Sequence, residues 1–347
     1  MPHEVLVYLV MCLCLYRQAA YEEVLHIVIE GLRRIYGDQV RDIAVSKGAI
    51  SIARTRVGPD VFESLYRSQV KPCAPAEMSG CWYRGLRVVG LDGSTMEMPE
   101  EKSNAAYYGH PGASRGAAAF PRLRFCTLAE CGTHTLFGAR MGPYKVSEHE
   151  LAKDVLQDTT SDMIVLADRG FTGYDLWQCA QANGARLLFR ARDSQVFPVH
   201  TELDDGSYLT KLYASPKARR RNEGIVVRIV EYRLGGSDQK YRLVTNWLEH
   251  TQAPAEELAA LYHRRWRIEV AIGELKTHLW NGTALRSKTP DLVCQEFYAL
   301  LIAHAAIRKL MTHAAQKTNQ TSEDLSFIHA VQVLRRRLPQ AAFPPSK

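Results

Sequence analysis

Apolar side chains recur at three- and four-residue spacing through the first part of the chain, which predicts helices. This spacing runs from Val5 to Leu15 and resumes from Val24 to Leu32, and no clear strand pattern interrupts it before about residue 80. The apolar run from Val5 to Tyr16 is too short to span a bilayer and lacks a small-residue cleavage pattern. We therefore expect a buried helix there.

A helix-turn-helix layout is predicted next. Residues 40–45 read as one helix, Ser46-Lys-Gly48 as a turn, and residues 49–57 as a second helix that carries Arg54 and Arg56. The second helix of such a motif contacts base edges, so both arginines are candidate DNA contacts. Two helices joined at a glycine also occur in many helical domains, and that ordinary interpretation stays open.

From about Arg87 the pattern changes to short apolar runs bounded by Gly or Pro, which predicts strands. Helical patterns are interleaved with the later runs. Hairpin strands followed by alternating helices and strands are typical of a mixed α/β sheet. The expected strands cover residues 88–92, 123–129, 133–140, 163–168 and 185–190, and the expected helices cover residues 147–156 and 174–182.

Residues 193–247 read as a separate β-rich piece, with strands near 224–232 and 241–245. A long helix is predicted after Pro254, because Glu256 and Glu257 suit the start of a helix dipole. Further helices are expected over about 291–313 and 323–337. The expected fold class is therefore α/β, a mixed sheet with a β-rich insertion, preceded and followed by helical regions.

The composition is that of an ordinary soluble globular protein, with 347 residues, 46% hydrophobic and 23% charged. Eight scattered cysteines without a C-x2-C pair favour reduced cytoplasmic thiols over a zinc site. A net charge of +7 favours an anionic partner. Basic residues gather at 217–221, 264–267 and 335–337, as expected for contact with a polyanion.

The predicted long helix carries a polar stripe. Tyr262, Arg265, Glu269 and Lys276 fall at relative positions 0, 3, 7 and 14, and at about 100° per residue they lie within roughly 60° of one another. A carboxylate in a row with two cations and a phenol suits metal and phosphate binding together. The ordinary alternative is a solvated helix face with an ion pair between Arg265 and Glu269.

Two aspartates complete an acidic set. Asp92 follows Val88-Val-Gly-Leu91, and Asp168 follows Ile164-Val-Leu-Ala167, so both are expected at the ends of neighbouring strands, where ligands gather in α/β sheets. Each aspartate alone reads as a turn residue. With Glu269 they would form a cage of hard oxygen ligands suited to Mg²⁺ or Mn²⁺.

In these motifs the chain resembles the DDE transposases of bacterial insertion sequences, in the group founded by insertion sequence four. The group's signature, Tyr-x2-Arg-x3-Glu-x6-Lys, is matched by the four residues of the stripe, and its two aspartates by Asp92 and Asp168. The resemblance covers nearly the whole chain and implies a ribonuclease H-like catalytic core. It implies a helical DNA-binding region over 1–85, a core split into 86–192 and 248–290, a β-rich insertion at 193–247 and a C-terminal helical region over 291–347.

The resemblance also implies a metal-dependent DNA transposase with Asp92, Asp168 and Glu269 as metal ligands. Two Mg²⁺ or Mn²⁺ ions about 3.5–4 Å apart would activate water for in-line attack at a phosphodiester and stabilise the leaving 3′ oxygen. The freed 3′-OH then attacks target DNA in the same site. The expected partners are double-stranded DNA, both the terminal inverted repeats and the target, and a second copy in a paired-end homodimer. The expected location is the bacterial cytoplasm, on the nucleoid and away from membranes.

Several side chains are predicted to contact DNA. Tyr262, Arg265 and Lys276 are expected to position backbone phosphates beside the metal ions. Relatives stack a flipped base on an aromatic ring, and Tyr241 or Trp247 is a candidate for that platform, with core packing as the commoner role. Trp266 is expected to pack beneath the helix. The histidines lack metal-ligand spacing and are expected to be structural or on the surface: His110, His134, His149 and His263.

Two other functions were weighed. A haloacid dehalogenase-like phosphatase also has a strand that runs into Asp-Gly-Ser/Thr, but it requires Asp-x-Asp, and the residue two before Asp92 is Gly90. A catalytically silent or truncated remnant that binds DNA and represses transposition is the alternative kept open. Met1 leads almost directly into the first predicted helix, whereas relatives extend further upstream, which is the pattern of a truncated copy.

Overall fold

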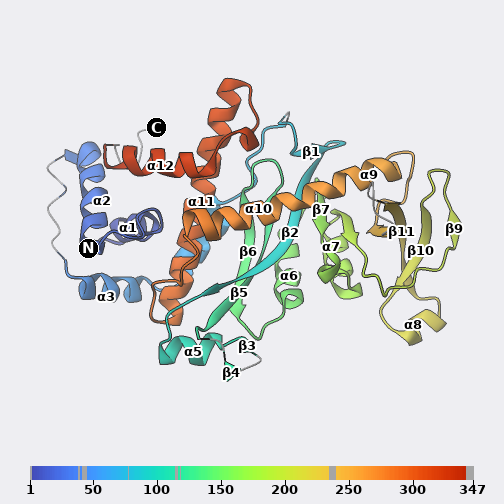
Figure 1. Ribbon diagram of the computed structural model, residues 1–347, viewed down its shortest axis with the longest axis horizontal. Helices are drawn as coiled ribbons and strands as arrows, with labels where there is room; N and C mark the ends of the chain where they lie inside the picture. The colour runs from blue at the N-terminus through green and yellow to red at the C-terminus, as the bar shows by residue number, and fades with distance from the viewer. Residues whose placement is uncertain are drawn as a thin grey trace.

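The computed structural model describes residues 2–37, 40, 45–76, 78–113, 116–117, 119–233 and 240–340. The molecule is elongated, with the N-terminal helices at one end and the strands near residues 201–233 at the other (Figure 1). The predicted early helices are confirmed. They are α1 (His3–Leu15), α2 (Tyr21–Tyr36), α3 (Lys47–Val57) and α4 (Asp60–Gln69).

One sheet forms the centre of the molecule, in the order β6-β5-β2-β7-β8-β12-β11-β10-β9. Its first five strands are β6 (Leu136–Pro143), β5 (Arg122–Glu130), β2 (Leu86–Glu97), β7 (Met163–Ala167) and β8 (Arg186–Arg190). Strands β2, β5 and β6 form an antiparallel meander, and β7 and β8 are parallel to β2. This order is ribonuclease H-like, so the expected fold class is confirmed.

The β-rich insertion is not a separate piece, which corrects the sequence-based expectation. Strand β12 pairs antiparallel with β8, and β11, β10 and β9 follow it in the same sheet. An unpaired edge at β8 would expose a row of backbone donors and acceptors, and β12 covers that edge. The insertion comprises β9 (Thr201–Glu202), β10 (Tyr208–Tyr213), α8 (Pro216–Arg220), β11 (Gly224–Arg233) and β12 (Lys240–Thr245).

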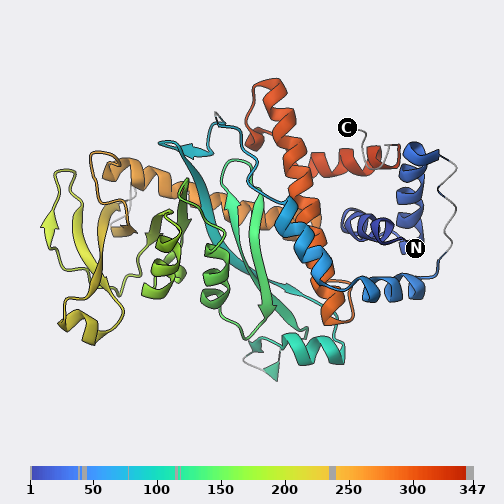
Figure 2. The same cartoon turned by 180° about the vertical axis from the view of Figure 1, so that it is seen from behind.

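Helices cover both faces of the sheet. In Figure 1 a long helix that begins with α9 (Ala255–Tyr262) crosses the near face, and Figure 2 shows α6 (Glu148–Leu156) and α7 (Tyr174–Ala182) on the opposite face. Successive residues of a strand pack alternately against the helices on the two faces, because their side chains point to opposite sides of the sheet. Val88, Ile164 and Leu166 pack in a cluster with Leu258 of α9, whereas Val89 and Val165 pack in the cluster that contains residues of α6 and α7.

The predicted long helix changes pitch three times. It runs from α9 through a 3-10 turn (His263–Arg265) and α10 (Trp266–Gly273) into a π-helical segment (Glu274–Leu279). It approaches the sheet closely at Gly90 of β2, where a Cβ atom would lie 3.0 Å from Cβ of Ile268. Glycine at position 90 therefore allows α10 to lie directly over β2.

The C-terminal helices join the core to the N-terminal helices. The 29-residue α11 (Pro290–Thr318) is longer than predicted and is followed by α12 (Phe327–Arg337). Both α1 and α4 pack on α11. In the described part of the chain, no helix is long and apolar enough to cross a membrane. The remaining short elements are α5 (Lys102–Tyr108), β1 (Trp82–Tyr83), β3 (Gly112–Ala113) and β4 (Gly116–Ala117).

The predicted helix-turn-helix is only partly described. Residues 41–44, most of its first helix, lie outside the described residues, whereas its second helix corresponds to α3. Ser46 caps that helix by accepting a hydrogen bond from the Ala49 N–H, so the boundary between turn and second helix is close to the predicted one.

A buried ionic cluster holds the π-helical segment against α11. Both carboxylate oxygens of Glu274 accept hydrogen bonds from the Arg308 guanidinium, at 2.6 and 2.9 Å. Nδ1 of His134 lies 3.1 Å and Nε2 of His304 3.4 Å from the same carboxylate. Burial disfavours ionisation of Glu274, but the hydrogen bonds from the histidines and the charge of Arg308 hold its pKa below the usual value. The cluster therefore contains a buried carboxylate that stays ionised.

Glu274→Gln is expected to lower the free energy of unfolding by about 3 kcal/mol, because it leaves Arg308 buried without a counter-charge. Glu257→Gln is the matched control. It breaks an exposed ion pair with Arg84 and is expected to leave the urea midpoint nearly unchanged, because solvent screens exposed ion pairs. Urea titration of both variants at neutral pH measures the difference. Equal losses would contradict a special role for the buried pair.

Candidate active site

Two carboxylates lie next to each other where the parallel pairing of β2 and β7 ends. The last paired residues are Leu91 and Ala167, so Asp92 and Asp168 occupy the next position of the register. Both share the side-chain parity of Leu166 and Val88, which face α9. Asp168 follows β7 directly, as predicted, but Asp92 lies inside β2, which continues to Glu97. The predicted strand end at Asp92 is therefore wrong, since β5 continues to pair with β2 beyond it.

The Asp92 carboxyl is strongly perturbed. Burial raises its pKa to about 6, and the negative charges of Asp168 and Glu269 add to this effect. A hydrogen bond from the Gly93 N–H, at 2.8 Å, and the charge of Arg265 act in the opposite direction. Asp168 and Glu269 are therefore close enough to Asp92 to raise the pKa of its carboxyl, and Arg265 is the nearby positive charge that opposes them.

Glu269 reaches the site from α10. Its Oε1 accepts a 2.6 Å hydrogen bond from Arg265, one turn earlier. The Glu269 side chain is 34% exposed and that of Arg265 16%. Arg265 also interacts electrostatically with Asp92. The ion pair between Arg265 and Glu269 that a solvated helix face would also form is therefore present. It lies close to Asp92.

Lys276 is attached to the same strand as Asp92. Its Nζ donates a 2.9 Å hydrogen bond to Oγ of Ser94, which lies two residues after Asp92 and so on the same face of β2. Burial lowers the pKa of Lys276, and the nearby Arg122 adds to that effect. The sequence analysis missed Ser94, although the two-residue alternation after Asp92 was a usable signal.

Tyr262 does not present its hydroxyl to solvent. It is 8% exposed, and its hydroxyl donates a 3.3 Å hydrogen bond to the carbonyl of Ala167, immediately before Asp168. Burial raises the pKa of this phenol. The phosphate contact predicted for Tyr262 would require its hydroxyl to leave the Ala167 carbonyl. The physical reason for this position is the packing of α9 on the sheet, which turns position 262 inward to support the end of β7.

The segment after Asp168 is held by its own hydrogen bonds. Oδ1 of Asp168 accepts a 2.8 Å bond from the Gly170 N–H. Nε2 of His149, on α6, lies 2.5 Å from the Gly170 carbonyl oxygen, and its ring stacks on Phe171. His149 therefore has the structural role that its lack of metal-ligand spacing predicted.

The donor chemistry of Asp92, Asp168 and Glu269 fits a divalent metal ion, because all three offer carboxylate oxygens and the charge of the cluster is unbalanced. Their side chains do not close around a common point: in the described part of the chain, no three His, Cys, Asp or Glu side chains are arranged to hold a metal. The hydrogen bond from Arg265 accounts for part of this, since it directs the Glu269 carboxylate toward the guanidinium.

The predicted aromatic platforms differ in accessibility. Trp247 is 7% exposed and belongs to the core cluster under α9, so it is not available to a base. Tyr241 is half-buried and stacks on Tyr232, with the Arg190 guanidinium 4.6 Å from its ring centroid. The expectation for Trp266 is wrong, because its ring is 61% exposed at the start of α10. The change to a 3-10 turn before α10 rotates this position away from the sheet.

Arg54 and Arg56 have opposite environments. Arg54 is 3% exposed and donates hydrogen bonds to Gln295, Ser287 and the Leu292 carbonyl. It therefore does not fit the predicted role in DNA reading, because its guanidinium is used to attach α3 to α11. Arg56, two residues later, is exposed.

Comparison with known proteins identifies a family. The model of the transposase DDE domain family matches residues 83–306, and that of the insertion element 4 transposase N-terminal region matches residues 1–67. The chain is 26% identical over 280 residues to the transposase InsG for insertion sequence element IS4 of Escherichia coli, which covers 78% of this chain and 62% of that protein. It is 29% identical over 133 residues to the putative transposase InsZ of Escherichia coli, which covers 38% of this chain and 44% of that protein.

A solved structure, the piggyBac transposase synaptic complex with hairpin DNA, aligns over 92% of this chain and 71% of its own, with a TM-score of 0.49 and 10% identity. The chain spans less than two thirds of the length of InsG and of InsZ, the two curated relatives named above. The match to the DDE domain extends over more than half of the chain and includes Asp92, Asp168 and Glu269. The chain therefore belongs to the DDE transposases of the insertion-sequence-four type.

Proposed function

We propose that this chain is a DNA transposase that cleaves phosphodiester bonds at the ends of its insertion element and joins the 3′-OH ends to target DNA. The observation that carries the proposal is the cluster of Asp92, Asp168 and Glu269, in which burial and the charges of Asp168 and Glu269 raise the pKa of the Asp92 carboxyl. A raised pKa at a cluster of like charges is typical of a functional site. Membership of the transposase family supports the same reaction.

The three carboxylates would hold the divalent metal ions, Mg²⁺ or Mn²⁺. When bound, such ions supply an activated water and stabilise charge on the leaving oxygen of an in-line displacement. Arg265 donates a hydrogen bond to Glu269 and retains N–H donors that suit a phosphate oxygen. Lys276, fixed to Ser94, places a second cation on the Asp92 face of β2. Both cations would position the DNA backbone.

The other parts of the chain would bind the DNA on which this reaction takes place. We infer that residues 1–85 contribute to DNA binding, with the exposed Arg56 as a contact, and that Trp266 and Tyr241 are the aromatic candidates for stacking on a base. The DNA partners are the terminal inverted repeats and the target duplex. Pairing of two ends requires two active sites, and a homodimer supplies them.

Glu269→Gln is expected to reduce nicking of a labelled duplex that carries the terminal repeat by at least roughly 100-fold, since even outer-shell partners of metal ligands cost 10–100-fold. DNA binding in EDTA is expected to persist. Glu256→Gln, an exposed change on the same continuous helix, is the matched control and should leave nicking unchanged. Binding without nicking by the unmodified chain in Mg²⁺ and in Mn²⁺ would instead identify a catalytically silent remnant.

Asp92→Asn is expected to stabilise the metal-free chain. A folded pKa of about 6 exceeds the unfolded value of about 3.9, so the folded chain binds protons more readily and loses stability as pH rises through that interval. Removal of the ionisable group is expected to raise the free energy of unfolding by about 2 kcal/mol at pH 7 and to have little effect at about pH 4. Unfolding in EDTA at both pH values tests this.

Two controls complete that test. Asp175→Asn changes an exposed carboxylate on α7 and is expected to shift stability by no more than about 0.5 kcal/mol. Added Mn²⁺ should raise the unfolding temperature of the unmodified chain, because a ligand that binds the folded state stabilises it, and should fail to do so for Asp92→Asn. An equal Mn²⁺ response in both proteins would contradict metal binding by Asp92.

A further inference from the structure

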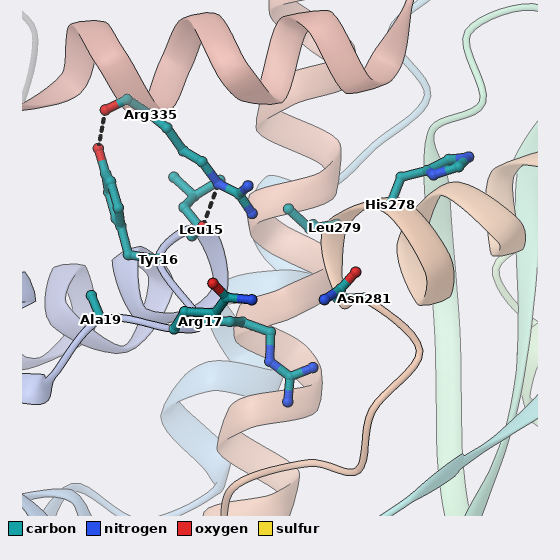
Figure 3. A pocket seen from close by; sticks show the side chains of 9 residues that line it. Leu15, Tyr16, Arg17, Ala19, His278, Leu279, Asn281 and Arg335 are labelled. Carbon is teal, nitrogen blue, oxygen red and sulfur yellow. Dashed lines mark hydrogen bonds between the residues drawn. The ribbon is translucent and has the colours of Figure 1, made fainter.

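A cationic hollow lies between the end of α1, the last turn of the long helix and α12. Its volume is about 420 Å³, within the range of about 300–1,000 Å³ that holds small ligands. The described residues that line it include no Asp or Glu. Figure 3 shows three of the lining side chains, Arg335 in the upper part of the view, Asn281 near the middle and Arg17 below it. We call it the Arg335 hollow.

The arginines of the Arg335 hollow are fixed without carboxylate partners. Nε of Arg335 donates a 2.7 Å hydrogen bond to the Leu15 carbonyl. Arg17 donates to the Ala284 carbonyl at 2.8 Å and lies over the Trp280 ring, 3.2 Å from its centroid. Burial lowers the pKa of Arg17 to about 10, so it remains a cation at neutral pH. A backbone carbonyl orients each guanidinium, and the Trp280 ring also packs against Arg17. The charge of Glu296 acts on Arg17, whereas no hydrogen bond to a carboxylate is formed by Arg335 among the described residues.

The Arg335 hollow is connected to the surroundings of Lys276 through Arg17 and Trp280. His278, on its rim, follows Lys276 by two residues in the π-helical segment. Trp280, which carries Arg17 on its ring, lines a second hollow of about 220 Å³ together with Lys276 and Arg122. The two hollows are therefore linked by the contact between Arg17 and Trp280, and each has cationic side chains in its lining.

We propose that the Arg335 hollow binds a backbone phosphate of DNA beside the cleavage site, on the side of the N-terminal helices. This inference rests on the proposed function. The planar fork of Arg335 uses only its Nε in the contact to Leu15, and its terminal nitrogens suit a phosphate oxygen pair. Exposed Gln18, His278 and Asn281 at the rim supply further polar groups. DNA in this position would connect α1 and α12 to the catalytic helix.

The test compares Arg335→Gln with Arg336→Gln in the full chain. Both remove one positive charge from α12, but Arg336 is exposed and does not line the hollow. Binding of a labelled mixed-sequence duplex is measured in EDTA over a series of salt concentrations. Arg335→Gln is expected to weaken binding roughly tenfold at low salt and to reduce the slope of log K against log salt by about 1. Equal slopes in the two variants would overturn the inference.

A second pair of variants covers the case in which Arg335→Gln does not fold. His278→Glu and Thr277→Glu change adjacent, exposed residues, and only the first lines the Arg335 hollow. A carboxylate at position 278 is expected to weaken duplex binding several-fold more than one at 277, because it repels a phosphate in the hollow. Equal effects would rule out phosphate binding there.

Failure of this inference differs from failure of the proposed function. If the unmodified chain binds and nicks DNA, and the paired variants behave alike, only the assignment of the Arg335 hollow is lost. If the unmodified chain does not bind the duplex at all, both the proposed function and this inference are wrong.

Discussion

The parallel pairing of β2 with β7 stops one position before Asp92 and Asp168, and the rest of the site depends on that register. Because side chains alternate across a strand, a shift of one residue would turn one carboxylate to the opposite face, under α6 and α7. β2 continues beyond this point on β5, so Asp92 is held by one neighbouring strand while the other side opens toward α10. Asp92 therefore lies within a paired strand, β2, whereas Asp168 lies just after the end of β7.

Such a cluster of like charges opposes folding, and the surrounding structure offsets it. Burial and neighbouring carboxylates raise the pKa of Asp92, whereas Arg265 supplies a nearby opposite charge. The helix that brings Glu269 is held at Gly90, where α10 touches the sheet, and at Glu274, where the π-helical segment is tied to Arg308. Destabilised functional residues on a well-anchored support are a common compromise between stability and activity.

Buried arginines perform much of the attachment between regions. Arg54 ties α3 to α11, Arg308 ties α11 to the catalytic helix, and Arg17 ties the end of α1 to the segment after that helix. In a basic chain, many arginines would be assigned to DNA by charge alone. Hydrogen bonds to partners within the protein separate the arginines that hold the fold from those that remain exposed, such as Arg56.

The sequence by itself determined the class of fold, because hydrophobic periodicity is a local property of the chain, and it singled out Asp92, Asp168 and Glu269 as predicted metal ligands. It did not determine which of the candidate side chains face solvent: Tyr262 and Arg54 are buried, and Trp266 is exposed. Only the tertiary structure decided that, since the change of helical pitch near residues 263–265 and the attachment of α3 to α11 arise from packing between distant segments. The pairing of β12 in the β-rich insertion with β8 is likewise long-range, and no local pattern in the sequence specifies it.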